Sequence, residues 1–258
     1  MTLYGIDTGL ETIPVLAFDE IDSTNPEARR RAEAGEAGPL WITAGVQTAG
    51  RGRRGRNWDT SRGNLAATLL IVTDTSPAEA AQLSFVAAFA IRALAERYVP
   101  ASLVRLKWPN DVMLDGRKLS GILIESGRNN AGLLWLAIGM GVNLAHAPTD
   151  LERPATALAA HLRADVAAPP TPSEALQVLS AAFVHHAAAW ARSGFAPLRE
   201  EWLKGAAGIG QACVARLDRE TVEGVAEGLD ADGALLLRLP DRSLRRIAAG
   251  DVFFPQVA

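Results

Sequence analysis

The 258-residue chain contains a single cysteine, Cys213, and therefore cannot form an internal disulfide. This cysteine usage is typical of a reducing compartment, so we expect a cytoplasmic protein. The first residues show no basic region followed by an apolar stretch, which argues against a secretory signal peptide. No uninterrupted apolar run predicts a membrane-spanning helix, and no membrane partner is expected.

The chain also lacks an excess of positive charge. It has 26 Lys and Arg residues against 29 Asp and Glu, which gives a net charge of −3 at pH 7. General nucleic-acid binders are usually basic overall, so DNA is not an expected partner. His185 and His186 have no acidic or cysteine neighbours at ligand spacing, which disfavours a metal site there.

One stretch is strongly basic against this background. Residues 50–58, here called the arginine loop, read GRGRRGRNW and contain four arginines. Glycine lets the backbone approach a ligand, and the guanidinium fork matches carboxylate and phosphate oxygens. A solvated surface, a disordered arm and a nonspecific nucleic-acid patch are the alternatives. Because predicted strands at 40–46 and 64–72 flank the loop, an ordered anion site is favoured.

The remaining pattern predicts an α+β fold, with a mixed β-sheet flanked by helices. Several strands follow one another with few helices between them, which disfavours a doubly wound sheet. We expect further strands at 12–19, within 104–114, at 118–125 and at 133–143, and helices at 25–31, 76–98, near 155–162, at 173–192 and at 196–204.

The composition changes at residues 205–210, and short alternating strands with tight turns follow. Asp232-Gly233 between two such strands is a strong hairpin signal. About fifty residues of hairpins suggest a small antiparallel barrel. The predicted domains are therefore 1–207 and 208–258.

A polar group precedes the first predicted helix. Asn25 is the expected N-cap, with Pro26 at the first helical position and Glu27 at the positive helix end. Ser23 and Thr24 thus present hydroxyls beside free N–H groups. Simple helix capping is the alternative to a binding role for them.

Four signatures now stand in order: Ser23-Thr24-Asn25, the arginine loop, KWPND followed by RKLSGILIE (107–111 and 117–125), and GMGVNL (139–144). Together they closely resemble the biotin protein ligase family, over essentially the whole chain. The closing GVAEGLDADGALLL (224–237) resembles that family's SH3-like C-terminal barrel. Because the first signature begins at residue 23, the resemblance is to the monofunctional class without an N-terminal DNA-binding domain.

This resemblance implies an ATP-dependent enzyme that adenylates biotin to biotinyl-5′-AMP, with Mg²⁺ as a cofactor. Biotin would then pass to one lysine of a biotin carboxyl carrier domain, as in acetyl-CoA carboxylase. The resemblance leaves a homodimer open. A lipoate ligase of the related fold and a non-catalytic phosphate- or nucleic-acid-binding module are the alternative functions.

The resemblance also assigns binding roles to individual residues. It places Ser23, Thr24 and Gln47 on the biotin ureido ring, with Asn25 close by. The biotin carboxylate and the adenylate phosphate would lie among Gly50, Arg51, Gly52, Arg53 and Lys118. The nucleotide would further contact Arg54, Arg56, Trp58 and Asn143, with Gly139 and Gly141 allowing close backbone approach, although an ordinary turn or bulge would explain these glycines too.

The catalytic residues implied are Lys118 and Arg53, which would stabilise negative charge, and Asp111. Asp111 would orient the acceptor amine or take up its proton. It could instead cap an Asx turn or bind magnesium. Cys213 is far in sequence from every motif, so no enzyme-borne covalent intermediate is expected.

Overall fold

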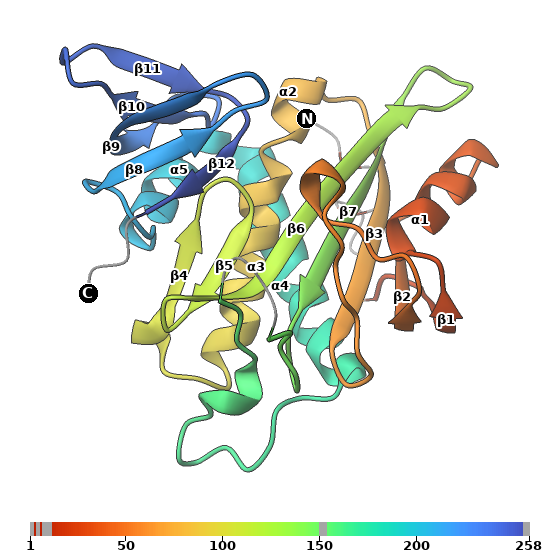
Figure 1. Cartoon of the computed structure of the whole chain (residues 1–258). Coiled ribbons are helices and arrows are strands. Elements are labelled where there is room, and N and C mark those ends of the chain that lie inside the picture. Colours follow the sequence, from red (N-terminus) through yellow and green to blue (C-terminus); the bar gives the residue numbers. More distant parts are fainter. Residues whose placement is uncertain (1–2, 4–5, 7–11, 150–153, 255–258) are drawn as a thin grey trace.

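The computed structural model describes residues 3, 6, 12–149 and 154–254. Its larger part is a seven-stranded sheet in the order β1-β2-β3-β7-β6-β5-β4 (Figure 1). β1 runs parallel to β2, and every other neighbouring pair is antiparallel. The strands are β1 (Val15–Ile21), β2 (Leu40–Gln47), β3 (Leu65–Thr73), β4 (Val104–Lys107), β5 (Asp111–Leu114), β6 (Arg117–Arg128) and β7 (Leu134–Val142). The predicted mixed sheet is confirmed.

The two faces of this sheet carry side chains of very different size. Along β3 and β7, large residues such as Leu69 and Ile138 point to the face covered by α3 (Leu83–Glu96) and α4 (Pro172–Ser193). Because side chains alternate along a strand, their neighbours point the opposite way. There Thr68 pairs with Gly139, and Ala66 pairs with Gly141. The second face is therefore lined by small residues near Ala66 and Gly141, whereas larger residues such as Leu70 and Trp135 lie on it next to α1.

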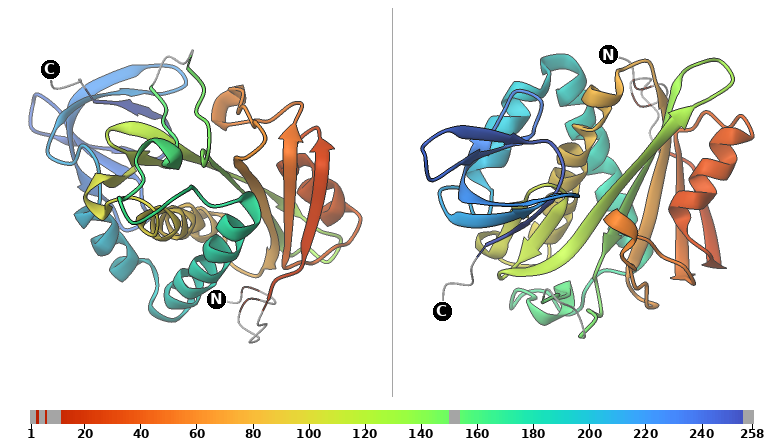
Figure 2. Two further views of the ribbon diagram at one scale, coloured as in Figure 1. Left: turned by 90° about the horizontal axis from the view of Figure 1, so that it is seen from below. Right: turned by 45° about the horizontal axis from the view of Figure 1, so that its top comes forward.

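Helix α1 (Thr24–Glu33) covers one end of this second face, where Ala28 and Ala32 pack on Ile42 and Leu70. Figure 2 shows the arginine loop on the opposite side of the sheet from α3 and α4. A pocket between α1 and the arginine loop is lined by residues of both and by Ala66.

Three predicted helices differ from the structure. The N-cap of α1 is Ser23 rather than Asn25, and Ser23 makes no side-chain cap because its hydroxyl bonds Gln47 instead. The capping box at Ser76 is present, but the predicted helix 76–98 is interrupted at Ala81 and Gln82, between α2 (Pro77–Ala80) and α3. Gln82 there accepts a hydrogen bond from the Trp190 indole.

The predicted helix near 155–162 is only a 3-10 turn, η3 (Leu158–Ala160). The N–H groups of Leu158 and Ala159 donate to the carbonyls of Asn143 and Leu144 instead of to their own segment. These bonds to an earlier segment of the same chain satisfy the backbone N–H groups without an α-helix.

One segment of the described chain, Pro77–Glu96, is long and apolar enough to cross a membrane by length and composition alone. It consists of α2 and α3, and 67% of its apolar window is buried. Its hydrophobicity is therefore explained by packing between the sheet and α4.

After α5 (Phe195–Lys204) the chain forms a five-stranded antiparallel sheet in the order β11-β10-β9-β8-β12. This confirms the predicted small C-terminal β-domain, which lies beside β4 and α5 in Figure 1. The Trp108 indole donates to the carbonyl of Gly233 across the two domains, at 3.0 Å. The strands are β8 (Ala212–Arg216), β9 (Thr221–Leu229), β10 (Leu235–Arg238), β11 (Leu244–Ile247) and β12 (Asp251–Phe253).

Candidate active site

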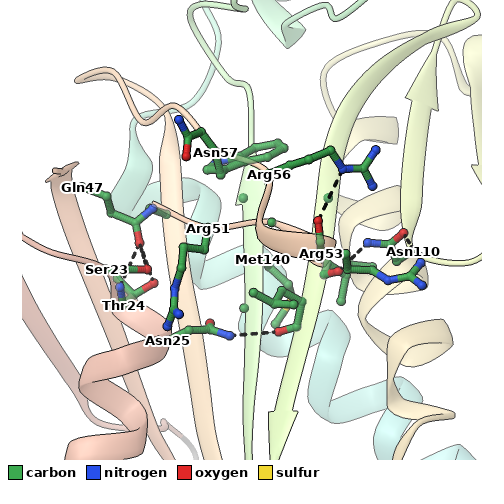
Figure 3. Close-up of a pocket in the computed structure, with 18 of the residues that line it drawn as sticks. Ser23, Thr24, Asn25, Gln47, Arg51, Arg53, Arg56, Asn57, Asn110 and Met140 are labelled. Carbon is green, nitrogen blue, oxygen red and sulfur yellow. Dashed lines mark hydrogen bonds between the residues drawn. The ribbon is translucent and has the colours of Figure 1, made fainter. Parts of the chain in front are cut away.

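A group of neutral polar side chains, here called the hydroxyl cluster, lies where β1, α1, β2 and β3 meet. It consists of Ser23, Thr24, Gln47 and Thr68. Gln47 Oε1 accepts from Ser23 Oγ at 3.1 Å, Thr24 Oγ1 at 3.1 Å and the Thr24 N–H at 2.8 Å (Figure 3). A carbonyl oxygen has two lone pairs, so three donors exceed its capacity. One hydroxyl can therefore turn toward an acceptor on a bound molecule.

Asn25 forms a wall of the cavity next to this cluster. Its Oδ1 accepts from Thr68 Oγ1 at 2.7 Å, and its Nδ2 donates to the Leu123 carbonyl at 3.2 Å and to Glu125 at 2.9 Å. A side chain at Gly139 would clash with Asn25 Oδ1. With these partners Asn25 closes the cavity as a fixed surface, and Gly139 makes room for it.

The indole of Trp58 packs against two further glycines, Gly121 and Gly141. A Cβ atom at Gly141 would overlap the Trp58 ring, and one at Gly121 would lie 3.2 Å from it. Trp58 thus lies flat on β6 and β7, with Lys118 Nζ 5.6 Å from its ring centroid. Of the two glycines expected to allow close approach, Gly141 receives Trp58 and Gly139 receives Asn25.

These residues enclose a cavity of about 160 Å³. Pockets for drug-sized ligands are usually about 300–1,000 Å³, so this volume suits a small ring system. Its lining includes Ser23, Thr24, Asn25, Gln47, Arg51, Gly52, Arg53, Arg56, Trp58, Lys118, Gly121, Gly139 and Gly141.

Lys118 and Asp111 form an ion pair at the edge of this cavity. Lys118 Nζ lies 2.6 Å from Asp111 Oδ1, and Asp111 is buried. Asp111 pairs with Gly121 in the β5–β6 register. A register shift between Val112 and Met113 in the same strand pair brings Lys118 onto the face of the sheet that carries Asp111. The lysine therefore stands at the cavity with its charge held by a buried carboxylate.

Arg51 and Arg53 reach the cavity from the arginine loop. Arg53 Nη1 donates to the neutral Asn110 Oδ1 at 3.2 Å. Burial lowers the pKa of Arg53 from its ordinary value, an effect that Asp251 and Asp111 partly offset. Arg51 lies 3.9 Å from Glu125. Arg53 is thus a desolvated cation whose hydrogen-bond partner is uncharged, which is the condition that favours binding an anion.

Arg54 and Arg56 turn toward the C-terminal domain. Arg54 bonds Asp218, and Arg56 Nη2 donates to Asp251 Oδ1 at 2.9 Å. Arg56 also lines the cavity, whereas Arg54 lies outside its lining. Their predicted contact with ATP phosphates stays a prediction.

Asn143 also lies outside the cavity lining. It is buried below β7, where its Nδ2 donates to the Thr156 carbonyl at 3.0 Å. Its predicted contact with adenine stays a prediction, and here it joins the segment after β7 to the turn before η3.

The structure adds site residues that sequence reasoning missed, namely Thr68, Glu125, Asn110 and Thr60. Thr60 accepts from Gln47 Nε2 at 2.8 Å and so fixes the orientation of that amide. Thr68 had a usable signal, since its hydroxyl lies in the middle of an apolar strand. Glu125 lies in the RKLSGILIE signature, where a carboxylate is a natural structural partner for an arginine, and it lies 3.9 Å from Arg51.

Comparison with known proteins identifies both domains. Residues 18–143 match the biotin/lipoate A/B protein ligase family, and residues 208–254 match the biotin protein ligase C-terminal domain. The chain is 42% identical to a biotin–[acetyl-CoA-carboxylase] ligase of Paracoccus denitrificans, over 90% of this chain and 97% of that protein. It is 31% identical to the corresponding ligase of Mycobacterium tuberculosis, over 97% and 91% of the two chains.

Solved structures agree with this family. The biotin protein ligase of Aquifex aeolicus in complex with biotin and ATP superposes with a TM-score of 0.77, at 24% identity over 93% of this chain and 97% of that one. The Leishmania major enzyme in complex with biotinyl-5-AMP gives 0.63, at 26% identity over 92% and 99%. With the sequence matches, these likenesses show that the chain belongs to the biotin protein ligase family.

Proposed function

We propose that the chain is an ATP-dependent biotin–protein ligase that forms biotinyl-5′-AMP and transfers biotin to a lysine of a biotin carboxyl carrier protein. The observation that carries this function is the joining of two unlike surfaces in one cavity. The hydroxyl cluster offers neutral donors and acceptors, and the arginine loop with Lys118 offers cations. Biotin has the same polarity, with a ureido ring at one end and a carboxylate at the other.

In the first step a carboxylate oxygen of biotin bonds the α-phosphorus of ATP, and pyrophosphate leaves. Two anions must meet, and negative charge spreads over the phosphoryl oxygens. Arg53 and Lys118 are positioned to stabilise that charge because both line the cavity as cations before substrate arrives. Ser23 and Thr24 would hold the ureido ring and so fix the distance to the reacting carboxylate.

In the second step an acceptor lysine attacks the carbonyl carbon of biotinyl-AMP, and AMP leaves. With a pKa near 10.4, only about one such amine in several thousand is neutral at pH 7. We propose that Asp111 orients this amine or takes up its proton. Its carboxylate is held by Lys118 in the structure. Phosphate oxygens that draw Lys118 away would therefore also release Asp111 for the second step.

Magnesium is implied by the reaction, yet the described residues do not form a protein-built site for it. Within that part of the chain no group of three or more His, Cys, Asp or Glu side chains could hold a metal ion. Asp111, the predicted ligand, is paired with Lys118. Mg²⁺ usually binds through one or two carboxylates together with substrate phosphates, so here it would be held mainly by the nucleotide.

The alternative substrate, lipoate, suits the hydroxyl cluster poorly. A dithiolane ring has no strong hydrogen-bond acceptor to engage Ser23 and Thr24, and a site with unpaired polar groups rejects such a ring strongly. Cys213 is buried in the C-terminal domain, where burial raises the pKa of its thiol, so it does not serve as a nucleophile for the cavity.

The acceptor, location and assembly are proposed on narrower grounds. The carrier protein is inferred from the names of the relatives, and a cytoplasmic location from the single buried cysteine. The homodimer that the resemblance leaves open stays open, and the domain boundary at 207/208 stays a prediction.

ATP–pyrophosphate exchange without acceptor protein tests the function. Exchange that depends on biotin is the expected result. Exchange with lipoate alone would move the chain to the lipoate ligases, and no exchange with either acid would favour a non-catalytic phosphate-binding module. Steep salt dependence of duplex DNA binding would separately support a nucleic-acid module.

A further inference from the structure

The C-terminal domain contacts the arginine loop through a set of acceptors at the joined ends of β8 and β12. Asp251 and Arg216 are register partners in these strands. Arg54 bonds Asp218, donates to the Arg216 carbonyl at 3.1 Å, and lies 3.6 Å from Asp251 Oδ2. Arg56 Nη2 lies 2.9 Å from Asp251 Oδ1. Two loop arginines are therefore held by one edge of the small domain.

Asp251 is the centre of this contact. Its side chain is 12% exposed and lies between both guanidinium groups, whereas Asp218 is 91% exposed. Ion pairs that are shielded from water are much less screened by salt than exposed ones. Asp251 should therefore contribute most of the attraction, and Asp218 little.

The backbone of the loop shows why such an anchor is needed. Arg54 adopts φ = 58°, a left-handed conformation that non-glycine residues rarely take, and Gly55 follows at φ = 71°. A conformation of this kind persists only where surrounding contacts hold it. The side-chain contacts of Arg54 lie with the C-terminal domain, and the turn they hold places Arg53 against Asn110 at the cavity.

We propose that Asp251 is a positioning residue for the adenylation site: it fixes the arginine loop from the C-terminal domain and so keeps Arg53 in place over the bound adenylate. This inference rests on the proposed ligase function. It gives the small domain a defined part in retaining the activated intermediate, without touching the reacting atoms.

The variant Asp251→Asn keeps the shape of the side chain and removes its charge. We expect biotinyl-AMP to dissociate about tenfold faster from it, since hydrogen bonds to charged groups contribute at the scale of a tenfold change or more. The KM for ATP should rise by more than the KM for biotin, because the hydroxyl cluster is not touched. Glu227→Gln is the matched control, since Glu227 pairs with Arg238 within the same domain, away from the loop.

A double-mutant cycle tests whether the contact itself acts. Asp251→Asn combined with Arg56→Gln should accelerate biotinyl-AMP release by less than the product of the two single effects, because both variants remove the Arg56–Asp251 ion pair. Additive effects would overturn the proposal. So would a D251N release rate equal to that of wild type, or a lowered KM for ATP, which would make Asp251 a competitor of the nucleotide. Equal melting temperatures of D251N and E227Q exclude a folding defect.

Failure of this inference is distinguishable from failure of the proposed function. If the unmodified chain shows no biotin-dependent pyrophosphate exchange, the ligase function fails. If it does, and D251N behaves like E227Q, only the anchoring role of Asp251 fails.

Discussion

The hydroxyl cluster and the arginine loop hold opposite parts of one cavity and are built in different ways. The cluster is neutral and largely buried, and its members bond one another through neighbouring elements. The loop is cationic and mostly exposed, and it depends on partners far away in the chain, such as Asp251. The cluster is therefore held together by its own members, whereas the arginine loop depends on contacts with the C-terminal domain.

Substitutions at the cationic end of the cavity should cause the largest loss of activity. We expect Lys118→Ala to slow biotin-dependent pyrophosphate exchange by about 10²–10³-fold, the usual cost of removing one fixed donor to developing negative charge. The exposed Lys204→Ala is the control. Lys118→Ala combined with Asp111→Asn also removes the charge of the buried carboxylate with which Lys118 pairs. Restored stability without restored exchange would assign the loss to chemistry, and unchanged exchange in K118A would contradict the role of Lys118.

Arg53→Gly should have the next largest effect, at about tenfold or more in the dissociation rate of biotinyl-AMP. The rate can be followed by trapping released intermediate. Arg53→Lys keeps the charge but not the planar fork, so its dissociation rate for biotinyl-AMP should lie between those of the wild type and Arg53→Gly. An unchanged dissociation rate in R53G would remove Arg53 from the retention of the adenylate.

The wall of the hydroxyl cluster can be tested by adding one methyl group. Gly139→Ala should weaken biotin binding about tenfold, because Asn25 must shift and overpacking costs about 1–3 kcal/mol. Gly228→Ala is the matched control, since nothing lies within 4 Å of its added Cβ. Titration calorimetry measures both. Equal biotin affinity for G139A and G228A would show that Asn25 is not a fixed wall.

Loss of a single neutral donor should cost less. Ser23→Ala should raise the KM for biotin about fivefold, the effect of one hydrogen bond worth about 1 kcal/mol, and leave the KM for ATP unchanged. Ser180→Ala removes a comparable hydroxyl, which accepts from the Trp41 indole outside the cavity. A proportional change in both KM values would mean that Ser23 does not distinguish the two substrates.

The smallest expected effect on stability concerns Asp22, just before the N-terminus of α1. Hydrogen bonds from Arg30 lower the pKa of Asp22 from 3.8 to about 2. A depressed carboxyl pKa stabilises the fold above pH 3.8, and this contribution disappears as the pH falls through about 2. Since Asp22 is 47% exposed, Asp22→Asn should cost less than about 1 kcal/mol at pH 7. Urea unfolding at pH 7 and pH 2 should show a difference only at pH 7.

Much of the fold follows from local patterns. Alternation and turn residues locate the strands to within a few residues, and all four signatures supply residues around one cavity or directly beneath it. Glycines at 139 and 141 lie on one face of β7, where they make room for Asn25 and Trp58. Such features depend on neighbours in the chain or on strand register.

The remainder depends on tertiary placement. The Arg56–Asp251 contact joins residues 195 positions apart, and no local pattern indicates which carboxylate a loop arginine will meet. The N-cap of α1 shifts to Ser23 because the cluster recruits its hydroxyl. Likewise Asn143, a plausible binding residue by motif, is drawn to Thr156 by the path of a later segment.

The position of Trp58 at the cavity has a consequence for the fluorescence of the protein. The chain has six tryptophans, and five of them, Trp41, Trp108, Trp135, Trp190 and Trp202, are buried in the core. Trp58 alone among them is partly exposed, with an ammonium group near its ring. Emission that shifts on ligand binding will therefore report chiefly on this indole. The protein carries its own fluorescent probe at the cavity, and loop movement can be timed without a label.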